Sequence, residues 1–321
     1  MSRLTRRALG AVPASLLAAP ALAQPGCPSR NVTIIVPFAA GGGTDVLTRL
    51  LAERMARELG RPVVVENRPG GNTIPGTEPV ARALPDGHTL LMGAGTNLTM
   101  NPLLHRRLVY KPEDFAPVTL ISTFPFAVIA RHDGPRDVAE MIAQAKARPG
   151  RMTYGTNGPT TLTNVAMLMV LERLGLSMQD VTYRGDAAQL NDFLAGNLDL
   201  MVVTGSTVLS VYRNNQGRLL AWTSAQRVPV TPEVPIFAET ALGIEASSWY
   251  GLVVPAGTPP AAIETLNRAA LGALREPELR RRLADDGQFL VGSTPAELGR
   301  FMAEQTEKWR PILARLDVPP S

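Results

Sequence analysis

The chain has 321 residues, a single cysteine and a formal net charge of +4 at neutral pH. This length provides one large domain or two of ordinary size, with a sizeable buried core. One cysteine excludes a fold that depends on internal disulfides, and most of the positive charge belongs to the first residues of the chain, which removes the case for a nucleic-acid partner.

The first residues have the pattern of an export signal. Arg3, Arg6 and Arg7 precede an apolar stretch without acidic residues, which ends in the small-x-small pattern Ala21-Leu22-Ala23. The stretch is too short and too rich in alanine to anchor the chain in a bilayer. We therefore predict a signal peptide over residues 1–23 and a periplasmic location. The paired arginines favour twin-arginine export, with general secretion as the alternative. Cleavage removes three arginines and no acid, so the net charge falls from +4 to +1.

Residues 31–60 combine a strand, a glycine bend and a helix. Residues 32–36 are a β-branched run typical of a buried strand, Gly41 to Gly43 form the bend, and residues 46–59 place apolar side chains at helical spacing. Unpaired N–H groups and the positive end of the helix dipole then face whatever lies above the bend. We predict that Thr44 and the backbone of residues 42–45 hold a carboxylate, while Asp45 caps the helix.

The simpler interpretation is that these glycines only turn the chain. The bend has neither the Lys-Ser/Thr of a nucleotide-triphosphate loop nor the spacing of a dinucleotide fingerprint, so no nucleotide cofactor is expected.

Strand and helix signals alternate along the rest of the chain. Strands are predicted at 62–66, 89–92, 118–130, 152–155, 181–183, 198–203, 219–223 and 249–254, and helices at 77–84, 137–147, 162–174, 186–194 and over most of 259–316. This alternation predicts an α/β protein with mainly parallel sheets flanked by helices.

Three bends of small and polar residues, 41–45, 93–97 and 156–161, follow strands. Ligands of open α/β sheets bind beyond the carboxyl ends of the strands, so two such halves would face each other across a cleft. We predict that the third bend, with Asn164 and with Thr204 nearby, donates to the far end of the ligand. The alternative is that these residues only cap helices.

No catalytic constellation is evident. His88, His105 and His132 have no partner at metal-ligand spacing, and no Gly-x-Ser-x-Gly elbow is present. We therefore expect no metal, no cofactor and no catalysis. A secreted hydrolase or isomerase that uses the cleft is the alternative.

Several motifs resemble one known family when they are taken together. They are Pro37-Phe38-Ala39 with Thr44-Asp45, Val65-Glu66-Asn67-Arg68-Pro69-Gly70, Pro85-Asp86-Gly87, Tyr183-x-Gly185, Gly196-x-Leu198-Asp199, and Ser248-Trp249-Tyr250-Gly251 before Pro255-Ala256-Gly257. In this order and spacing the chain resembles the Bug-type solute receptors of tripartite tricarboxylate transporters.

The resemblance implies a periplasmic two-domain "Venus flytrap", in which each domain has a mostly parallel sheet flanked by helices and the ligand cleft lies between them. It predicts domain 1 over 24–126 and 249–321 and domain 2 over 127–248. It also implies a monomer that binds a small organic acid or amino-acid-like ligand and delivers it to membrane permease subunits. In the family the ligand is held mostly by backbone N–H groups, hydroxyls and water. The predicted ligand-binding residues are Phe38, Gly42, Gly43, Thr44, Asp45, Thr96, Thr156, Asn157, Gly158, Thr161, Asn164, Asp186 and Thr204.

The chain departs from the family pattern on one cleft wall. Asn164 and Val165 replace a usual His-Leu pair, Asp186 replaces a usual serine, and Val203 stands where an acid is usual. If Asp186 faces the cleft, its charge favours a ligand with an amine, an amide or several hydroxyls over a diacid. The alternative is that Asp186 only caps the helix that follows.

Overall fold

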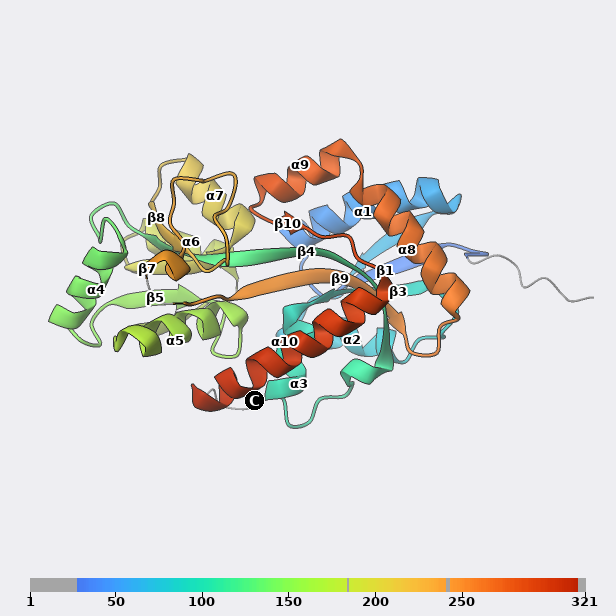
Figure 1. The fold of residues 1–321 in the computed structure, drawn as a ribbon, viewed down its shortest axis with the longest axis horizontal. Helices are drawn as coiled ribbons and strands as arrows, with labels where there is room; N and C mark the ends of the chain where they lie inside the picture. Colours follow the sequence, from blue (N-terminus) through green and yellow to red (C-terminus); the bar gives the residue numbers. More distant parts are fainter. Residues whose placement is uncertain (1–27, 184, 241–242, 317–321) are drawn as a thin grey trace, which may run out of the picture.

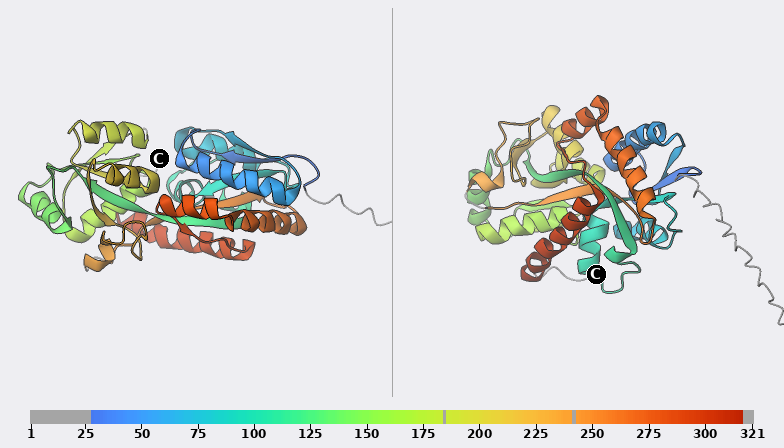
Figure 2. Two further views of the ribbon diagram at one scale, coloured as in Figure 1. Left: turned by 90° about the horizontal axis from the view of Figure 1, so that it is seen from above. Right: turned by 45° about the vertical axis from the view of Figure 1, so that its right-hand side comes forward.

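The computed structural model describes residues 28–183, 185–240 and 243–316, so the predicted signal peptide and Cys27 lie outside the described residues. Two lobes are joined by the long strands β4 (Phe115–Ala130) and β9 (Ser247–Pro255), which run along the molecule (Figure 1). Seen from above, the yellow-green helices of one lobe and the blue helices of the other stand apart, and the long strands and the red helix α10 run from one lobe to the other (Figure 2). No helix in the described part of the chain is long and apolar enough to cross a bilayer.

The first lobe is built on a sheet in the order β2-β1-β3-β9-β4. Strand β1 is parallel to β2 and β3, whereas β9 is antiparallel to β3 and β4, and β10 pairs antiparallel with β4. Its elements are β1 (Val32–Val36), α1 (Gly43–Leu59), β2 (Val63–Asn67), η1 (Gly71–Thr73), α2 (Ile74–Ala81), β3 (Thr89–Ala94), η2 (Thr96–Met100), α3 (Asn101–Leu104), η3 (Pro112–Asp114), α8 (Pro260–Leu274), α9 (Pro277–Asp285) and β10 (Phe289–Leu290).

The second lobe continues from the other end of β4. There β4 is antiparallel to β7 and β8, and β5 is parallel to β6 and β7. Its elements are α4 (Val138–Ala147), β5 (Thr153–Thr156), α5 (Leu162–Leu174), β6 (Gln179–Thr182), α6 (Asp186–Leu194), β7 (Leu200–Thr204), α7 (Gly205–Arg213), β8 (Arg218–Trp222) and η4 (Phe237–Thr240).

The predicted α/β fold with helices flanking the sheets is confirmed. The sheets are mixed rather than mainly parallel, because β4 and β9 run against their neighbours. Helix α7, where the sequence indicated only a bend, and the two-residue strand β10 were not predicted, and neither were the short helix α3 and the turns η1, η3 and η4. The bend expected at 93–97 is instead the end of β3 and the start of the helical turn η2.

Helix α10 (Pro295–Arg315) packs on both lobes. Leu298, near its start, belongs to the core around Trp249, and Trp309 and Leu313 belong to the core of the second lobe around α5. Strand β4 pairs with β9 up to Pro125 and with β7 from Phe126. The domain boundaries given above stay a prediction.

Thr223 ties together the two places where the chain passes between the lobes. Its N–H donates to Phe126 O at 2.9 Å, and its Oγ1 accepts from Phe126 N at 2.9 Å. The same hydroxyl donates to Ala246 O at 2.6 Å, just before β9. Thr223 is buried, so water cannot replace these bonds. One side chain therefore fixes the separation of both connecting segments.

We predict that Thr223→Val lowers the free energy of unfolding by about 1–3 kcal/mol, because the isosteric side chain leaves Phe126 N and Ala246 O with a lost partner. Denaturant unfolding measures the change. The same substitution at the half-buried Thr265, on α8, is the control and should shift stability by less than ~0.5 kcal/mol, because its hydroxyl bonds only within its own helix. Equal effects at the two positions would contradict the role given to Thr223.

Candidate functional site

A cleft of about 590 Å³ lies between the lobes. This volume is within the usual range for sites that hold a small molecule. Both lobes contribute to its walls, which are lined by Phe38, Ala39, Gly41, Gly42, Gly43, Thr44, Phe124, Gly185, Asp186, Ala187, Leu190, Thr204, Gly205, Thr207, Ser210, Tyr250, Asp286 and Gln288. The cleft is thus formed by the segments that follow β1, β6 and β7, together with parts of β4, β9 and the end of α9.

The first-lobe wall is the start of helix α1. Gly42 is the residue before the helix and has no side-chain cap, so the N–H groups of Gly43 and Thr44 begin the helix without an intrahelical acceptor. They line the cleft at the positive end of the helix dipole. This is a backbone site for an anion.

Asp45 serves this helix start and does not line the cleft. Its Oδ2 accepts from Gly41 N at 2.8 Å, and Arg49 Nε lies 3.0 Å from Oδ1. Burial alone would raise the pKa of the Asp45 carboxyl, but the hydrogen bonds from Arg49 and Gly41 outweigh it and lower that pKa. The Asp45 carboxylate is therefore kept charged by partners in its own chain. The N–H groups of Gly43 and Thr44 stay available for a ligand.

Three aromatic rings form the wall beside the α1 start. Phe38 meets Tyr250 edge-on with centroids 6.5 Å apart, and Phe124 lies against the same ring at 4.5 Å. Thr44 Oγ1 donates to the Tyr250 hydroxyl at 2.7 Å. Burial raises the pKa of Tyr250 to about 12, with the nearby charges of Asp186 and Asp286 acting in the same direction. Tyr250 therefore keeps its proton, which it can donate toward the cleft.

The second-lobe wall carries two more helix starts, those of α6 and α7. Asp186, the first residue of α6, lines the cleft, and its side chain does not cap its own helix. Asn157 Nδ2 donates to its Oδ1 at 2.7 Å, and Thr207 Oγ1, in the first turn of α7, donates to its Oδ2 at 2.8 Å. The interpretation of Asp186 as a helix cap is wrong, because Gly185 (φ +114°) precedes the helix and the carboxylate bridges two other elements.

The loop between β5 and α5 is bonded mostly to itself. Thr161 caps α5 by accepting from Asn164 N, and Asn164 Nδ2 donates to Pro159 O. Thr156 Oγ1 donates to Asp180 Oδ1 at 2.7 Å and accepts from Gly158 N. None of these described residues lines the cleft, and Asn157 reaches it only through Asp186. The expectation that this loop lines the cleft is therefore wrong, because its donors are used within the loop and by Asp180 and Asp186.

Thr96 also lies away from the cleft, at the start of η2. The predicted residues that do line it are Phe38, Gly42, Gly43, Thr44, Asp186 and Thr204. Sequence reasoning missed Phe124, Thr207, Tyr250, Asp286 and Gln288 as lining residues. Of these, only Tyr250 carried a usable signal, since it stands in one of the family motifs.

Asp286 and Gly205 bring the two lobes into close contact at the cleft. A Cβ atom added to Gly205, the first residue of α7, would lie 2.1 Å from the backbone oxygen of Asp286, which follows α9. Burial raises the pKa of the Asp286 carboxyl, and Arg282 Nε, 3.1 Å away, opposes this without overcoming it. Asp286 is thus a second carboxylate on the cleft wall, contributed by the opposite lobe from Asp186.

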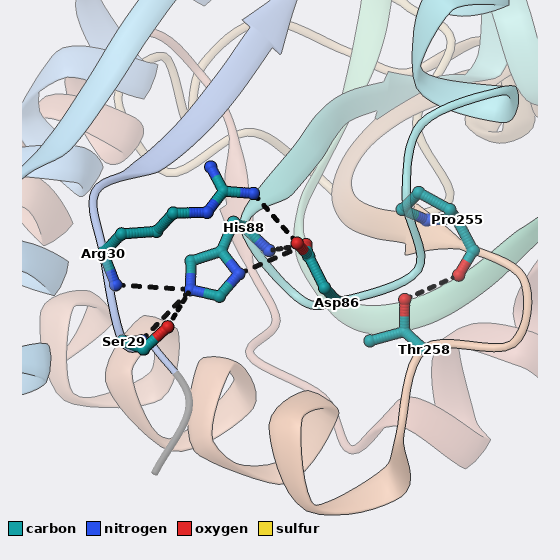
Figure 3. Close-up of polar contacts among 6 residues, drawn as sticks. All are labelled: Ser29, Arg30, Asp86, His88, Pro255 and Thr258. Atoms are coloured by element: carbon teal, nitrogen blue, oxygen red, sulfur yellow. Dashed lines mark hydrogen bonds and ion pairs between the residues drawn. The ribbon is translucent and has the colours of Figure 1, made fainter. Parts of the chain in front are cut away.

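The histidines lie elsewhere. His88 Nε2 accepts from the N–H groups of Ser29 and Arg30, and its Nδ1 lies 3.2 Å from Asp86 Oδ1 (Figure 3). The ring therefore fastens the start of the described chain to the turn before β3. His105 contacts Asn72, and His132 contacts the backbone of Asn215. No histidine is among the described residues that line the cleft.

The family model described as TctC, tripartite tricarboxylate transporter family receptor, matches residues 47–318. The chain belongs to this receptor family. Protein BugT of Bordetella pertussis is 32% identical over 292 residues, which cover 89% of each chain. A Pseudomonas protein encoded in the tcbD-tcbE intergenic region is 32% identical over 290 residues, 89% of this chain and 86% of its own.

Solved structures give the same result. The periplasmic binding protein BugD is 31% identical with a TM-score of 0.81, over 91% of this chain and 99% of its own. MatC of Rhodopseudomonas palustris, with bound malate, is 29% identical with a TM-score of 0.80, over 89% and 99%. An R. palustris protein with adipate is 28% identical with a TM-score of 0.85, over 92% and 100%. The family resemblance that the sequence motifs indicated is thereby confirmed, and the chain has the fold of periplasmic binding proteins.

We predict that Gly205→Ala pushes the lobes apart at α7, because its methyl group cannot occupy the space taken by the Asp286 carbonyl. Small-angle scattering should give a larger radius of gyration, and stability should fall by about 1–3 kcal/mol, the usual cost of overpacking. Gly71→Ala is the control, since a Cβ there meets nothing within 4 Å. An unchanged radius and an unchanged stability would refute the close contact.

Proposed function

We propose that this protein is an extracytoplasmic receptor that captures a small carboxylated solute between its lobes and delivers it to a tripartite tricarboxylate-type membrane transporter. The observation that carries the proposal is the start of α1, where the N–H groups of Gly43 and Thr44 and the hydroxyl of Tyr250 face one cleft. Malate in MatC and adipate in the R. palustris relative support a small carboxylate as the class of ligand.

One carboxylate of the solute lies at the α1 start. Its oxygens accept from the N–H groups of Gly43 and Thr44 and from the Tyr250 hydroxyl, and the helix dipole adds a favourable field. The Phe38 and Phe124 rings cover the apolar part of the solute. Asp186 and Thr204 face its far end, while Asn157 acts on the solute through Asp186.

The receptor is non-catalytic, and it works as a monomer in the periplasm after export through a twin-arginine signal peptide. Domain 1 spans 24–126 and 249–321, domain 2 spans 127–248, and they close on the solute. The titratable groups on the described cleft walls are Asp186, Asp286 and Tyr250. This set argues against a hydrolase or isomerase. A Tyr250 hydroxyl with a pKa of about 12 is a poor base at neutral pH.

Ligand released from the purified native protein and identified by mass spectrometry tests the proposal, together with thermal-shift screening of small acids. We expect that a small acid is released in chemically unaltered form. When it is added back to the ligand-free protein, it should raise the melting temperature. Conversion of that acid into a product by the purified protein would overturn the receptor assignment and favour the enzyme.

We predict that Gly42→Val weakens binding of that acid at least about tenfold, which corresponds to ~1.4 kcal/mol, while the fold persists. The backbone at Gly42 (φ −74°) suits any residue, and its added Cβ would meet only Ala39 O, at 3.4 Å. The new side chain would therefore stand in the cleft without straining the bend. Calorimetric titration measures the affinity, and Gly71→Val is the control. Unaltered affinity in Gly42→Val would show that the carboxylate does not bind at this bend.

We predict that Tyr250→Phe weakens binding about 10- to 100-fold, because a hydrogen bond to a charged group contributes roughly 1.5–3 kcal/mol. The aromatic contacts with Phe38 and Phe124 are retained, so the melting temperature without ligand should change little. Tyr212→Phe, which removes an exposed hydroxyl bonded to Glu233, is the matched control. A loss of the same size in both variants would assign Tyr250 no role in the site.

A further inference from the structure

The carboxylate of Asp186 lies on the second-lobe wall of the cleft, beside the starts of two helices. It lies in the first turn of α6, and its Oδ2 is bonded to Thr207 in the first turn of α7. Helix starts attract anions through their free N–H groups and their dipoles. Here two such starts already have a carboxylate of the chain itself between them.

No cation among the described residues forms an ion pair with the Asp186 carboxylate. Asp45 and Asp286 form ion pairs with Arg49 and Arg282, at 3.0 and 3.1 Å. The partners of Asp186 are the neutral side chains of Asn157 and Thr207, and no ion pair among the described residues includes it. Its negative charge therefore acts on whatever enters the cleft.

A second carboxylate of a ligand would meet this charge, and the Asp286 carboxyl lines the same cleft from the first lobe. Like charges a few ångströms apart repel, and the repulsion is stronger near a protein surface than in bulk water. An ionised carboxyl group offers about four acceptor sites, of which Asn157 and Thr207 use two on Asp186. The free sites suit a hydrogen-bond donor, and a positively charged donor best of all.

We propose that the solute of this receptor carries one carboxylate, bound at the α1 start, and an ammonium group at its other end, bound by Asp186. This inference rests on the proposed receptor function and narrows its ligand to an amino acid whose amine is separated from the carboxylate. A primary amide at that end ranks second, because it donates without a charge. A second carboxylate ranks last.

The test compares three series of ligands on the mature protein after bound solute has been removed. Each series has a carboxylate at one end, between one and five methylenes, and an ammonium, a primary amide or a second carboxylate at the other end. At a spacer of three methylenes the set is 4-aminobutyrate, glutaramate and glutarate. At the best spacer we expect the amine to bind at least about tenfold tighter than the diacid, with the amide between them.

Asp186→Asn removes the charge and keeps a side chain of the same shape for Thr207 and Asn157. We expect the ratio of amine to diacid affinity to fall at least about tenfold in this variant. Asp285→Asn is the matched control, because Asp285 is adjacent to Asp286, is half-exposed and does not line the cleft, and its ratio should stay that of the native protein. Asp286→Asn provides a second variant, on the opposite lobe, and should lower the ratio in the same direction.

A native protein that prefers the diacid, or a ratio that Asp186→Asn leaves unmoved, would overturn the inference. The receptor function would still stand if mass spectrometry of the native protein found a diacid bound and unchanged. Turnover of any bound acid would instead remove the proposed function itself. An amine bound in the native protein and lost in Asp186→Asn, with glutarate gained, supports both.

Discussion

The backbone N–H groups that α1, α6 and α7 leave unpaired at their first turns are the constraint on which the cleft depends. Each of these helices follows a strand, and their starts lie on the walls of one cleft. The first N–H groups of a helix cannot be satisfied within it, so each start needs an acceptor from elsewhere. A site that lies among three such starts selects negative charge without any Lys or Arg side chain on its described walls.

The chain distributes its own carboxylates over these starts unequally. At α1, Asp45 bonds to the Gly41 N–H ahead of the helix and pairs with Arg49, which leaves Gly43 and Thr44 free for a ligand. At the starts of α6 and α7, the Asp186 carboxylate accepts from the side chains of Asn157 and Thr207. The two walls of the cleft therefore differ: the α1 start on the first lobe has backbone donors free for a ligand, and the second lobe presents the Asp186 carboxylate beside the α6 and α7 starts.

The secondary structure of a segment could be predicted from the sequence where it depends only on the residues of that segment. The strand, bend and helix over residues 32–59 follow from periodicity and from three glycines, and helix α5 was predicted with the bounds it has. Helix α7 was missed because Thr204, Gly205 and Thr207 have turn or strand preferences that packing overrides. Strand β10 could not be predicted from two residues, since it exists only through pairing with Ser122 and Thr123, far away in the chain. Asp286 was missed for the same reason: its helix brings it to the cleft from a distant part of the sequence.

The two walls of the cleft belong to different lobes, so a ligand that contacts both walls also links the lobes. Thr223 fixes the two segments that connect the lobes, and Gly205 meets the Asp286 backbone where both line the cleft. The α1 start belongs to one lobe and Asp186 to the other. A solute that satisfies only one of them binds to a single lobe and adds nothing to the contact between the two. A solute whose ends match both walls stabilises the lobes in their approach, because differential binding to the closed arrangement is what shifts a conformational equilibrium. Under the proposed function, the contacts that select a solute are also the contacts that hold the two lobes together around it.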